Sequence, residues 1–234
     1  MSRTSAPRRS RRARRSARPP SCRTDADTGR RDWKLPTPIA GRSTADPDVG
    51  GRRYSPPVTT NGAGQVPTAD EEAQFWKLIE TAWAACGPEP AQIRRALLGR
   101  DPAADDDNGD LYALEAWLDR FLAQLRGLCA DLSSAELTVL DRVVERKLYD
   151  LDRRDVHEHT DGSDDGFLYC RGFIVAAGRE FYDAVHADPA MAVMDAECET
   201  MCYFFAHLHD ERFGDYPDTG SGISRESGRN PGGW

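Results

Sequence analysis

Residues 163–185 read SDDGFLYCRGFIVAAGREFYDAV, and this stretch decides the fold. Its apolar side chains recur every three or four residues, which is the spacing of an α-helix. Further apolar residues cover much of the remaining surface, so the predicted helix is apolar almost all round, as in the interior of a helical bundle. The sequence therefore predicts one long central helix that ends at Asp188-Pro189. Its main stripe is Phe167, Cys170, Ile174, Ala177, Phe181 and Val185.

Two glycines lie inside this predicted helix, Gly172 and Gly178. Each costs about 1 kcal/mol of helix propensity relative to alanine. The absence of a side chain there allows a neighbouring helix to approach closely. We therefore expect close packing against this helix.

Start and stop signals predict further helices on both sides. Thr68-Ala69-Asp70-Glu71 and Ser133 with Glu136 are capping boxes, in which a hydroxyl and a carboxylate satisfy free N–H groups at a helix start. No stretch shows the sustained alternation of a strand. The sequence predicts an all-α fold, a compact bundle of five or six helices. The other expected helices run from about 68 to 86, 90 to 98, 110 to 125 with Asp110 as cap, 133 to 151, and 195 to 213 with Gly214 as the C′ residue.

Composition divides the chain into three parts. Residues 1–66 hold 15 basic and 5 acidic residues, with few large apolar ones, so we expect a disordered basic tail. Residues 67–214 form the predicted helical domain, and residues 215–234 are expected to be a loose polar segment. Residues 67–234 hold 16 basic and 34 acidic residues. The tail is either a solvated segment, a segment that attracts phosphate backbones, or sequence upstream of a later start of translation.

Several motifs resemble a known family. Ser163-Asp164-Asp165-Gly166-Phe167, Arg171-Gly172-Phe173 and Gly178-Arg179-Glu180 are similar, in order, to motifs of a bacterial family catalogued as domain of unknown function 4240. The segment Phe75–Glu80 is similar to that family's opening helix, so the resemblance covers roughly residues 70–213. It implies a small helical fold and no established activity. The chain departs from the family in having a charged segment, Asp150–Asp161, where many members are Trp-rich.

The acidic start of the central helix has two interpretations. Read as a calcium loop that begins at Asp161, it would need a bidentate Glu at position 12, where the chain has Gly172. We therefore favour helix capping, in which Ser163 or Asp164 accepts the free N–H groups and Asp165 faces the positive helix end. An unusual cation site is the alternative.

Arg171 and Arg179 are charges in an otherwise apolar helix, and each needs a partner if it is buried. Asp183 lies four residues after Arg179 and can pair with it. Arg171 can pair with an acidic residue of another helix. The alternative to such ion pairs is an anion-binding arginine in a pocket.

Histidines and cysteines suggest two further sites. His157-Glu158-His159 lies close to Asp161 in a polar segment and is either a solvated loop or part of a metal or acid–base site. The residues Cys198, Cys202 and His209 fall on roughly one helix face, as zinc ligands do, but they also lie among core residues. We predict no metal and no cofactor.

The sequence indicates the function of the protein less directly than its fold. Hydrolase and phosphate-binding motifs are absent, and the acidic domain favours basic partners over nucleic acid, except through the basic tail. We expect a non-enzymatic protein-interaction or regulatory module of a bacterial, cytoplasmic protein with an unknown protein partner and no membrane association. The alternative is an enzyme or small-ligand binder whose pocket is formed by Asp164, Asp165, Arg171 and the His157–His159 loop, with Arg179 as a further candidate.

Overall fold

The structure is a computed structural model that describes residues 64–103 and 112–234. All regular elements in these ranges are helical, so the predicted all-α class is confirmed. Most of the tail that we expect to be disordered lies outside the described residues, and so does the predicted helix cap Asp110. The α-helices are α1 (Ala69–Cys86), α2 (Pro88–Gly99), α3 (Leu118–Leu128), α4 (Ser134–Asp150), α5 (Arg154–His157), α6 (Asp164–Ala176), α7 (Arg179–Ala187) and α8 (Glu199–Phe213). Two short 3₁₀ turns, Glu115–Trp117 and Pro189–Met191, precede α3 and follow α7.

Both predicted capping boxes are present. The Thr68 hydroxyl accepts the N–H of Glu71 and the Glu71 carboxylate accepts the N–H of Thr68, which starts α1. Ser133 and Glu136 make the same reciprocal pair at the start of α4. Gly214 ends α8 in the left-handed conformation, with φ of 84°, as predicted for its C′ residue.

The prediction of one continuous central helix is wrong. The chain breaks at Gly178, whose φ of 102° no α-helix contains, and α7 begins directly after it. A side chain at Gly178 would also meet the Arg94 guanidinium and the Glu80 carboxylate, so both conformation and space require glycine there. This break, together with the short α5, raises the number of described α-helices to eight, above the five or six expected.

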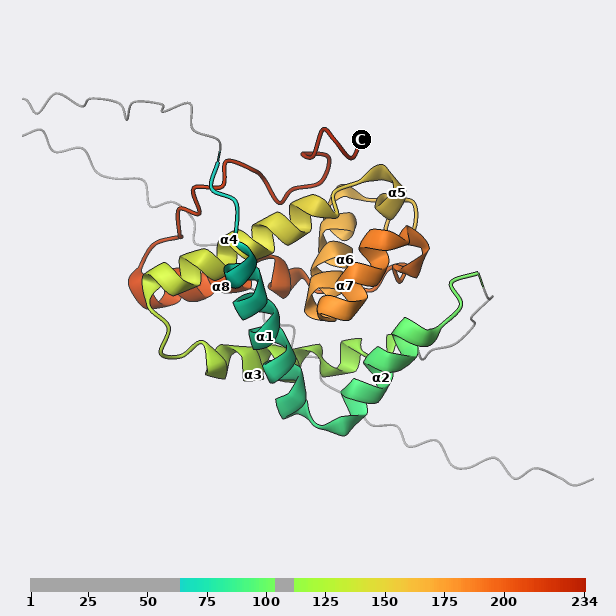
Figure 1. Cartoon of the computed structure of the whole chain (residues 1–234), viewed down its shortest axis with the longest axis horizontal. Helices are drawn as coiled ribbons and strands as arrows, with labels where there is room; N and C mark the ends of the chain where they lie inside the picture. Colours follow the sequence, from blue (N-terminus) through green and yellow to red (C-terminus); the bar gives the residue numbers. More distant parts are fainter. Residues whose placement is uncertain (1–63, 104–111) are drawn as a thin grey trace, which may run out of the picture. The chain divides into compact units, whose positions relative to one another are not determined.

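The first half of that segment is nevertheless the interior helix. Between Gly166 and Ala176, every residue of α6 except Tyr169 is buried. Helix α6 packs against α8, α4 and α7, while α4 packs against α8 and α1 against α3 (Figure 1). A Cβ at Gly172 would lie 2.4 Å from the carbonyl oxygen of Cys198 and 2.6 Å from Sγ of Cys202. The close approach expected at this glycine is therefore real, and α8 makes it.

Several helix bounds differ from the sequence prediction. Helix α3 begins at Leu118, after a 3₁₀ turn, and not directly after Asp110. Helix α8 begins at Glu199 instead of Asp195, because Asp195 has a left-handed φ of 58° that a helix does not continue through. The polar segment that holds His157 and His159 contains the single helical turn α5. None of the helices in the described ranges has the length and apolar character needed to cross a membrane.

The segment 215–234 contains no helix or strand, yet it is not loose. It leaves the end of α8 and runs past α4 toward α5, where it ends (Figure 1). Near its start the carbonyl oxygen of Gly220 accepts the N–H of Gln65 at 2.8 Å, just before α1. Farther along, Ser221 and Arg225 are buried. Hydrogen bonds to side chains of the helices hold this segment in place. The spacing of apolar residues in the sequence does not indicate such contacts.

Candidate functional site

The acidic start of α6 is a helix cap. The Ser163 hydroxyl accepts the N–H of Gly166 at 3.0 Å, and Asp161 Oδ1 accepts both the N–H and the hydroxyl of Ser163 at 2.6 Å. These hydrogen bonds lower the pKa of the Asp161 carboxyl. Asp164 and Asp165 are exposed in the first turn of α6. The capping interpretation is therefore confirmed for Ser163.

Arg171 is the most unusual of the predicted site residues because its side chain has no exposed surface. Its guanidinium donates to the carbonyl oxygen of Leu148 at 2.8 Å and to the hydroxyl of Ser227 at 3.0 Å, and it lies 4.6 Å from the centre of the Phe167 ring. Its Nε has no hydrogen-bond partner. Burial lowers the pKa of Arg171, and the nearby Asp152 carboxylate opposes that change. The expected ion pair with another helix is thus replaced by neutral partners.

Arg179 differs, because it is exposed at the start of α7 instead of lying in an apolar helix interior. It makes the expected pair with Asp183, at 3.4 Å, and about 60% of each side chain is exposed (61% and 60%). An exposed pair of this kind adds at most about 1 kcal/mol of stability.

The two histidines of the His157–His159 segment lie differently. The ring of His157 packs edge-on against Phe167, with ring centres 4.9 Å apart, and against Trp234 at 5.4 Å. His159 is exposed. His157 and Arg171 both contact the Phe167 ring, but Arg171 is fully buried and His159 is exposed. The predicted residues therefore do not gather around one open pocket that includes Arg171.

The possible zinc residues take part in packing. Cys198 and Cys202 are buried, which raises the pKa of each thiol to about 12. The ring of His209 bonds instead to the Ser134 hydroxyl at 2.6 Å and to the carbonyl oxygen of Asp215 at 2.7 Å. Across the described ranges, no three His, Cys, Asp or Glu side chains are grouped to hold a metal.

Asp152, which the sequence reasoning did not single out, organises the end of the chain. Its fully buried carboxylate accepts the main-chain N–H groups of three consecutive residues of the segment 215–234, and the indole N–H of Trp234 at 3.0 Å. The three main-chain donors are Gly228 at 2.9 Å, Arg229 at 2.6 Å and Asn230 at 2.8 Å. Three of these four hydrogen bonds are donated by main-chain N–H groups, so they do not depend on which side chains those residues carry.

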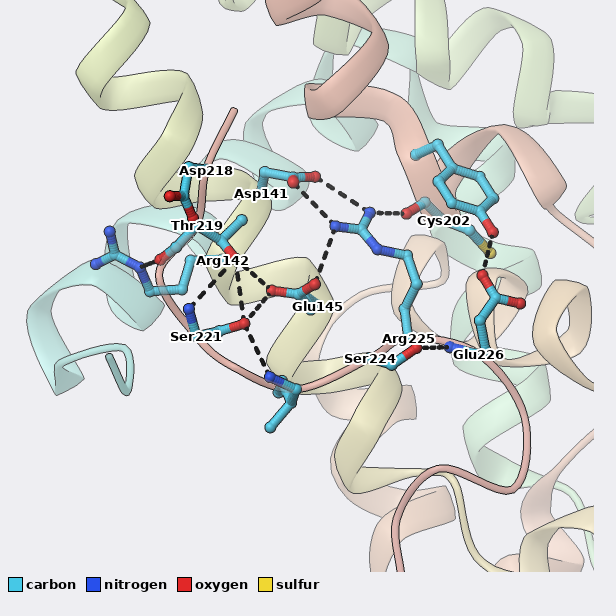
Figure 2. A network of polar contacts seen from close by, with 12 residues as sticks. Asp141, Arg142, Glu145, Cys202, Asp218, Thr219, Ser221, Ser224, Arg225 and Glu226 are labelled. Carbon is cyan, nitrogen blue, oxygen red and sulfur yellow. Dashed lines mark hydrogen bonds and ion pairs between the residues drawn. The ribbon is translucent and has the colours of Figure 1, made fainter. Parts of the chain in front are cut away.

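A second missed group surrounds Arg225. Its guanidinium makes a two-pronged contact with Asp141, at 3.2 and 2.9 Å, and donates to the carbonyl oxygen of Cys202 at 2.6 Å (Figure 2). Glu145, one turn after Asp141 on α4, lies 3.6 Å from the same guanidinium, and the Tyr203 ring lies 5.3 Å away. Two carboxylates, a carbonyl and an aromatic face thus enclose one arginine.

Charge and burial act against each other in this group. Burial raises the pKa of the Asp141 carboxyl, and the Arg225 charge opposes that rise. Oε2 of Glu145 accepts the hydroxyls of Thr219 at 2.7 Å and Ser221 at 2.5 Å, and Oε1 faces Arg225 (Figure 2). Both oxygens of Glu145 therefore face the segment 215–234. The sequence signal was present, since Asp141 lies four residues after Leu137 and three before Val144 on the apolar face of α4. Its partner, 84 residues away, was not detectable.

Two hollows lie beside α4. One, of about 470 Å³, opens next to Arg225 and is also lined by His207, Tyr216 and Asp218. The other, of about 360 Å³, lies between α1 and α4, and we call it the α1–α4 groove. Apolar side chains line the α1–α4 groove, and the glutamates of the two capping boxes also contribute to its lining. Its apolar lining is Leu78, Leu132, Ala135, Val139 and Leu140, and its acidic residues are Glu71 and Glu136.

Comparison with known proteins agrees with the sequence resemblance. A family described as protein of unknown function (DUF4240) matches residues 105–210. Over this segment the chain is similar to the DUF4240 family. This DUF4240 match contains α3 to α7 and most of α8, including Arg171 and Asp152, whereas the opening helix at Phe75–Glu80 and the segment 215–234 lie outside it. No curated protein and no solved structure matches the chain.

Proposed function

We propose that the helical domain is a protein-interaction module that binds a basic amphipathic segment of a partner protein in the α1–α4 groove. The observation that carries the proposal is the composition of that groove, apolar in its lining and acidic at Glu71 and Glu136. A helix or turn with apolar residues on one side and lysine or arginine beside them complements both properties. That the protein is bacterial and that it is cytoplasmic both stay predictions.

The charge of the domain supports this choice. Residues 67–234 hold 16 basic and 34 acidic residues, so the domain attracts basic partners and repels nucleic acid phosphates. The long-range attraction speeds association, while the apolar lining supplies the affinity that surface charge alone does not.

The alternative, a small-ligand or catalytic pocket around the Asp-Asp-Gly and Arg-Gly motifs, is less well supported. It depends on Arg171, whose side chain has no exposed surface and is covered by Phe167 and Ser227. Asp164 and Asp165 are exposed, at the start of the same helix.

The proposal is tested with a synthetic amphipathic peptide of leucine and lysine, labelled with fluorescein, added to the full chain. We expect binding that weakens as salt is added. Val139→Gln, which makes the lining polar, should weaken it at least tenfold. Glu71→Gln together with Glu136→Gln removes the acidic charge while glutamine keeps both capping boxes, and it should reduce the salt dependence.

Two controls separate the groove from general stickiness. Met194→Gln changes an exposed apolar residue (54% exposed) elsewhere and should leave binding unchanged. A peptide of leucine and glutamate should not bind. The proposal fails if the acidic peptide binds as well as the basic one, or if Val139→Gln and the wild-type chain bind equally.

A further inference from the structure

The contacts that hold the segment 215–234 resemble the contacts that hold a bound peptide. None of the buried apolar residues of the described chain lies after Leu208, so this segment contributes nothing to the hydrophobic core. It is held instead by hydrogen bonds, ion pairs and the ring of Trp234. Polar contacts of this kind can be replaced by contacts with water or with another peptide, and the apolar core stays intact when they are replaced.

One side chain is recognised specifically. The Arg225 guanidinium fits a pocket that the helices supply: Asp141 and Glu145 from α4 and the carbonyl oxygen of Cys202 from α8 (Figure 2). The ring of Tyr203, also from α8, lies 5.3 Å from the same guanidinium. The paired contact with Asp141 matches the planar fork of a guanidinium, and a lysine cannot reproduce it. The seated arginine shows which ligand the two carboxylates accept.

Other contacts with the segment are made to its backbone. Asp152 accepts the N–H groups of Gly228, Arg229 and Asn230, and the Arg142 side chain donates to the carbonyl oxygen of Thr219 at 2.7 Å. One specific anchor combined with main-chain contacts is the usual way in which a protein holds an extended peptide. These contacts do not require the particular side chains of this segment.

The pocket has room beyond Arg225. The hollow of about 470 Å³ beside it is lined by Glu145, Tyr203 and His207 from the helices and by Tyr216 and Asp218 from the segment itself. The segment therefore fills its own binding surface incompletely, and an occupant with larger side chains has space there.

We propose that the surface formed by Asp141, Glu145, Tyr203 and Asp152 is a peptide-binding site for an arginine-bearing extended segment of a partner protein. The chain's own residues 219–234 occupy this site as an internal ligand and exclude the partner until they are displaced. The site is separate from the α1–α4 groove and does not depend on the function proposed for it. The acidic charge of the domain favours an occupant that carries arginine.

The test uses a fluorescein-labelled peptide with the sequence of residues 217–234, added to the full chain. In the wild type the attached segment competes at an effective concentration in the millimolar range, roughly, so micromolar peptide should bind poorly. In Arg225→Ala the pocket is vacated, and we expect at least tenfold tighter binding. The same peptide carrying Arg225→Ala should bind that variant at least tenfold more weakly, and adding Asp141→Asn to the chain should abolish the difference between the two peptides.

A second variant tests the proposal without altering the pocket. Gly228 has a left-handed φ of 71°, so Gly228→Ala strains the turn that presents three N–H groups to Asp152 and should also raise peptide affinity. The proposal is overturned if both variants, folded by circular dichroism, bind neither peptide or bind the arginine and alanine peptides equally. It is also overturned if the wild type is a dimer that Arg225→Ala dissociates, since the occupant would then be a second copy of the chain.

Discussion

At the scale of single residues, the domain treats its two buried arginines in opposite ways. Arg225 faces two carboxylates, whereas the direct partners of Arg171 are a carbonyl oxygen, a hydroxyl and an aromatic ring, and the Asp152 charge opposes the lowering of its pKa. Sequence reasoning correctly identified Arg171 as a charge that needs a partner. It did not identify the partner, because Leu148 O is a backbone group and Ser227 lies in a segment without periodicity.

The capping box of α4 allows a prediction about pH at this scale. Hydrogen bonds from Ser133 lower the pKa of Glu136, so the folded state favours the ionised carboxylate. The stabilisation is therefore complete above the ordinary glutamate value of 4.5 and is lost as the pH falls through the lower value of the folded state. Ser133→Ala should cost about 1 kcal/mol at pH 7, and its cost should shrink below pH 4.5.

Urea denaturation at pH 7 and at about pH 3.5 measures both values. Glu136→Gln serves as the control, because glutamine keeps the capping box but does not titrate. A cost of Ser133→Ala that grows on acidification would contradict the assigned direction of the Glu136 pKa.

At the scale of helices, the packing of α6 on α8 depends on Gly172. A methyl group there would lie 2.4 Å from the Cys198 carbonyl oxygen, which is backbone and cannot rotate away. Gly172→Ala should therefore lower the free energy of unfolding by about 1–3 kcal/mol, although alanine is the better helix former.

Gly127 provides the matched control. It is exposed near the end of α3, and a Cβ there meets nothing within 4 Å. Gly127→Ala should leave stability unchanged or raise it by up to about 1 kcal/mol. Equal effects of the two substitutions in thermal or urea unfolding would show that α6 and α8 are not held as close as the structure places them.

The helices also show what a single sequence reveals. Capping boxes and the 3.6-residue period are local, so the starts of α1 and α4 and the burial of α6 were predictable. The break between α6 and α7 was not, because Gly178 resembles Gly172 in the sequence, whereas in the folded chain only Gly178 of the two has a positive φ, next to Arg94 and Glu80. The difference is one of backbone conformation, which composition does not encode.

At the scale of the whole described domain, the segment 215–234 joins elements that are distant in sequence. Its contacts reach from Gln65, before α1, to Arg154 in α5. The candidate sites that depend on it were not predictable, because Asp141 and Arg225, or Asp152 and Gly228, are paired only in the folded chain. A polar stretch rich in glycine and serine carries the same sequence signal whether it is free or bound.

Asp152→Asn tests this joining. In the variant, the N–H₂ group of asparagine faces N–H donors that bind a carboxylate oxygen in the wild type. Hydrogen exchange at Gly228, Arg229 and Asn230 should therefore become at least tenfold faster. The free energy of unfolding should fall by about 2–4 kcal/mol. Hydrogen-exchange mass spectrometry measures the first effect and urea denaturation the second. Asp155→Asn is the control, since that exposed partner of Arg153 should cost less than about 1 kcal/mol. Unchanged exchange in Asp152→Asn would mean that other contacts hold the segment.

The hydrogen bond between Gln65 and Gly220 has a practical consequence. Because the backbone that enters the helical domain and the backbone that leaves α8 meet at 2.8 Å, the stretch between these two residues can be grafted into a surface loop of a host protein without forcing the loop ends apart, with residues 221–234 added as a separate peptide to satisfy Asp141 and Asp152.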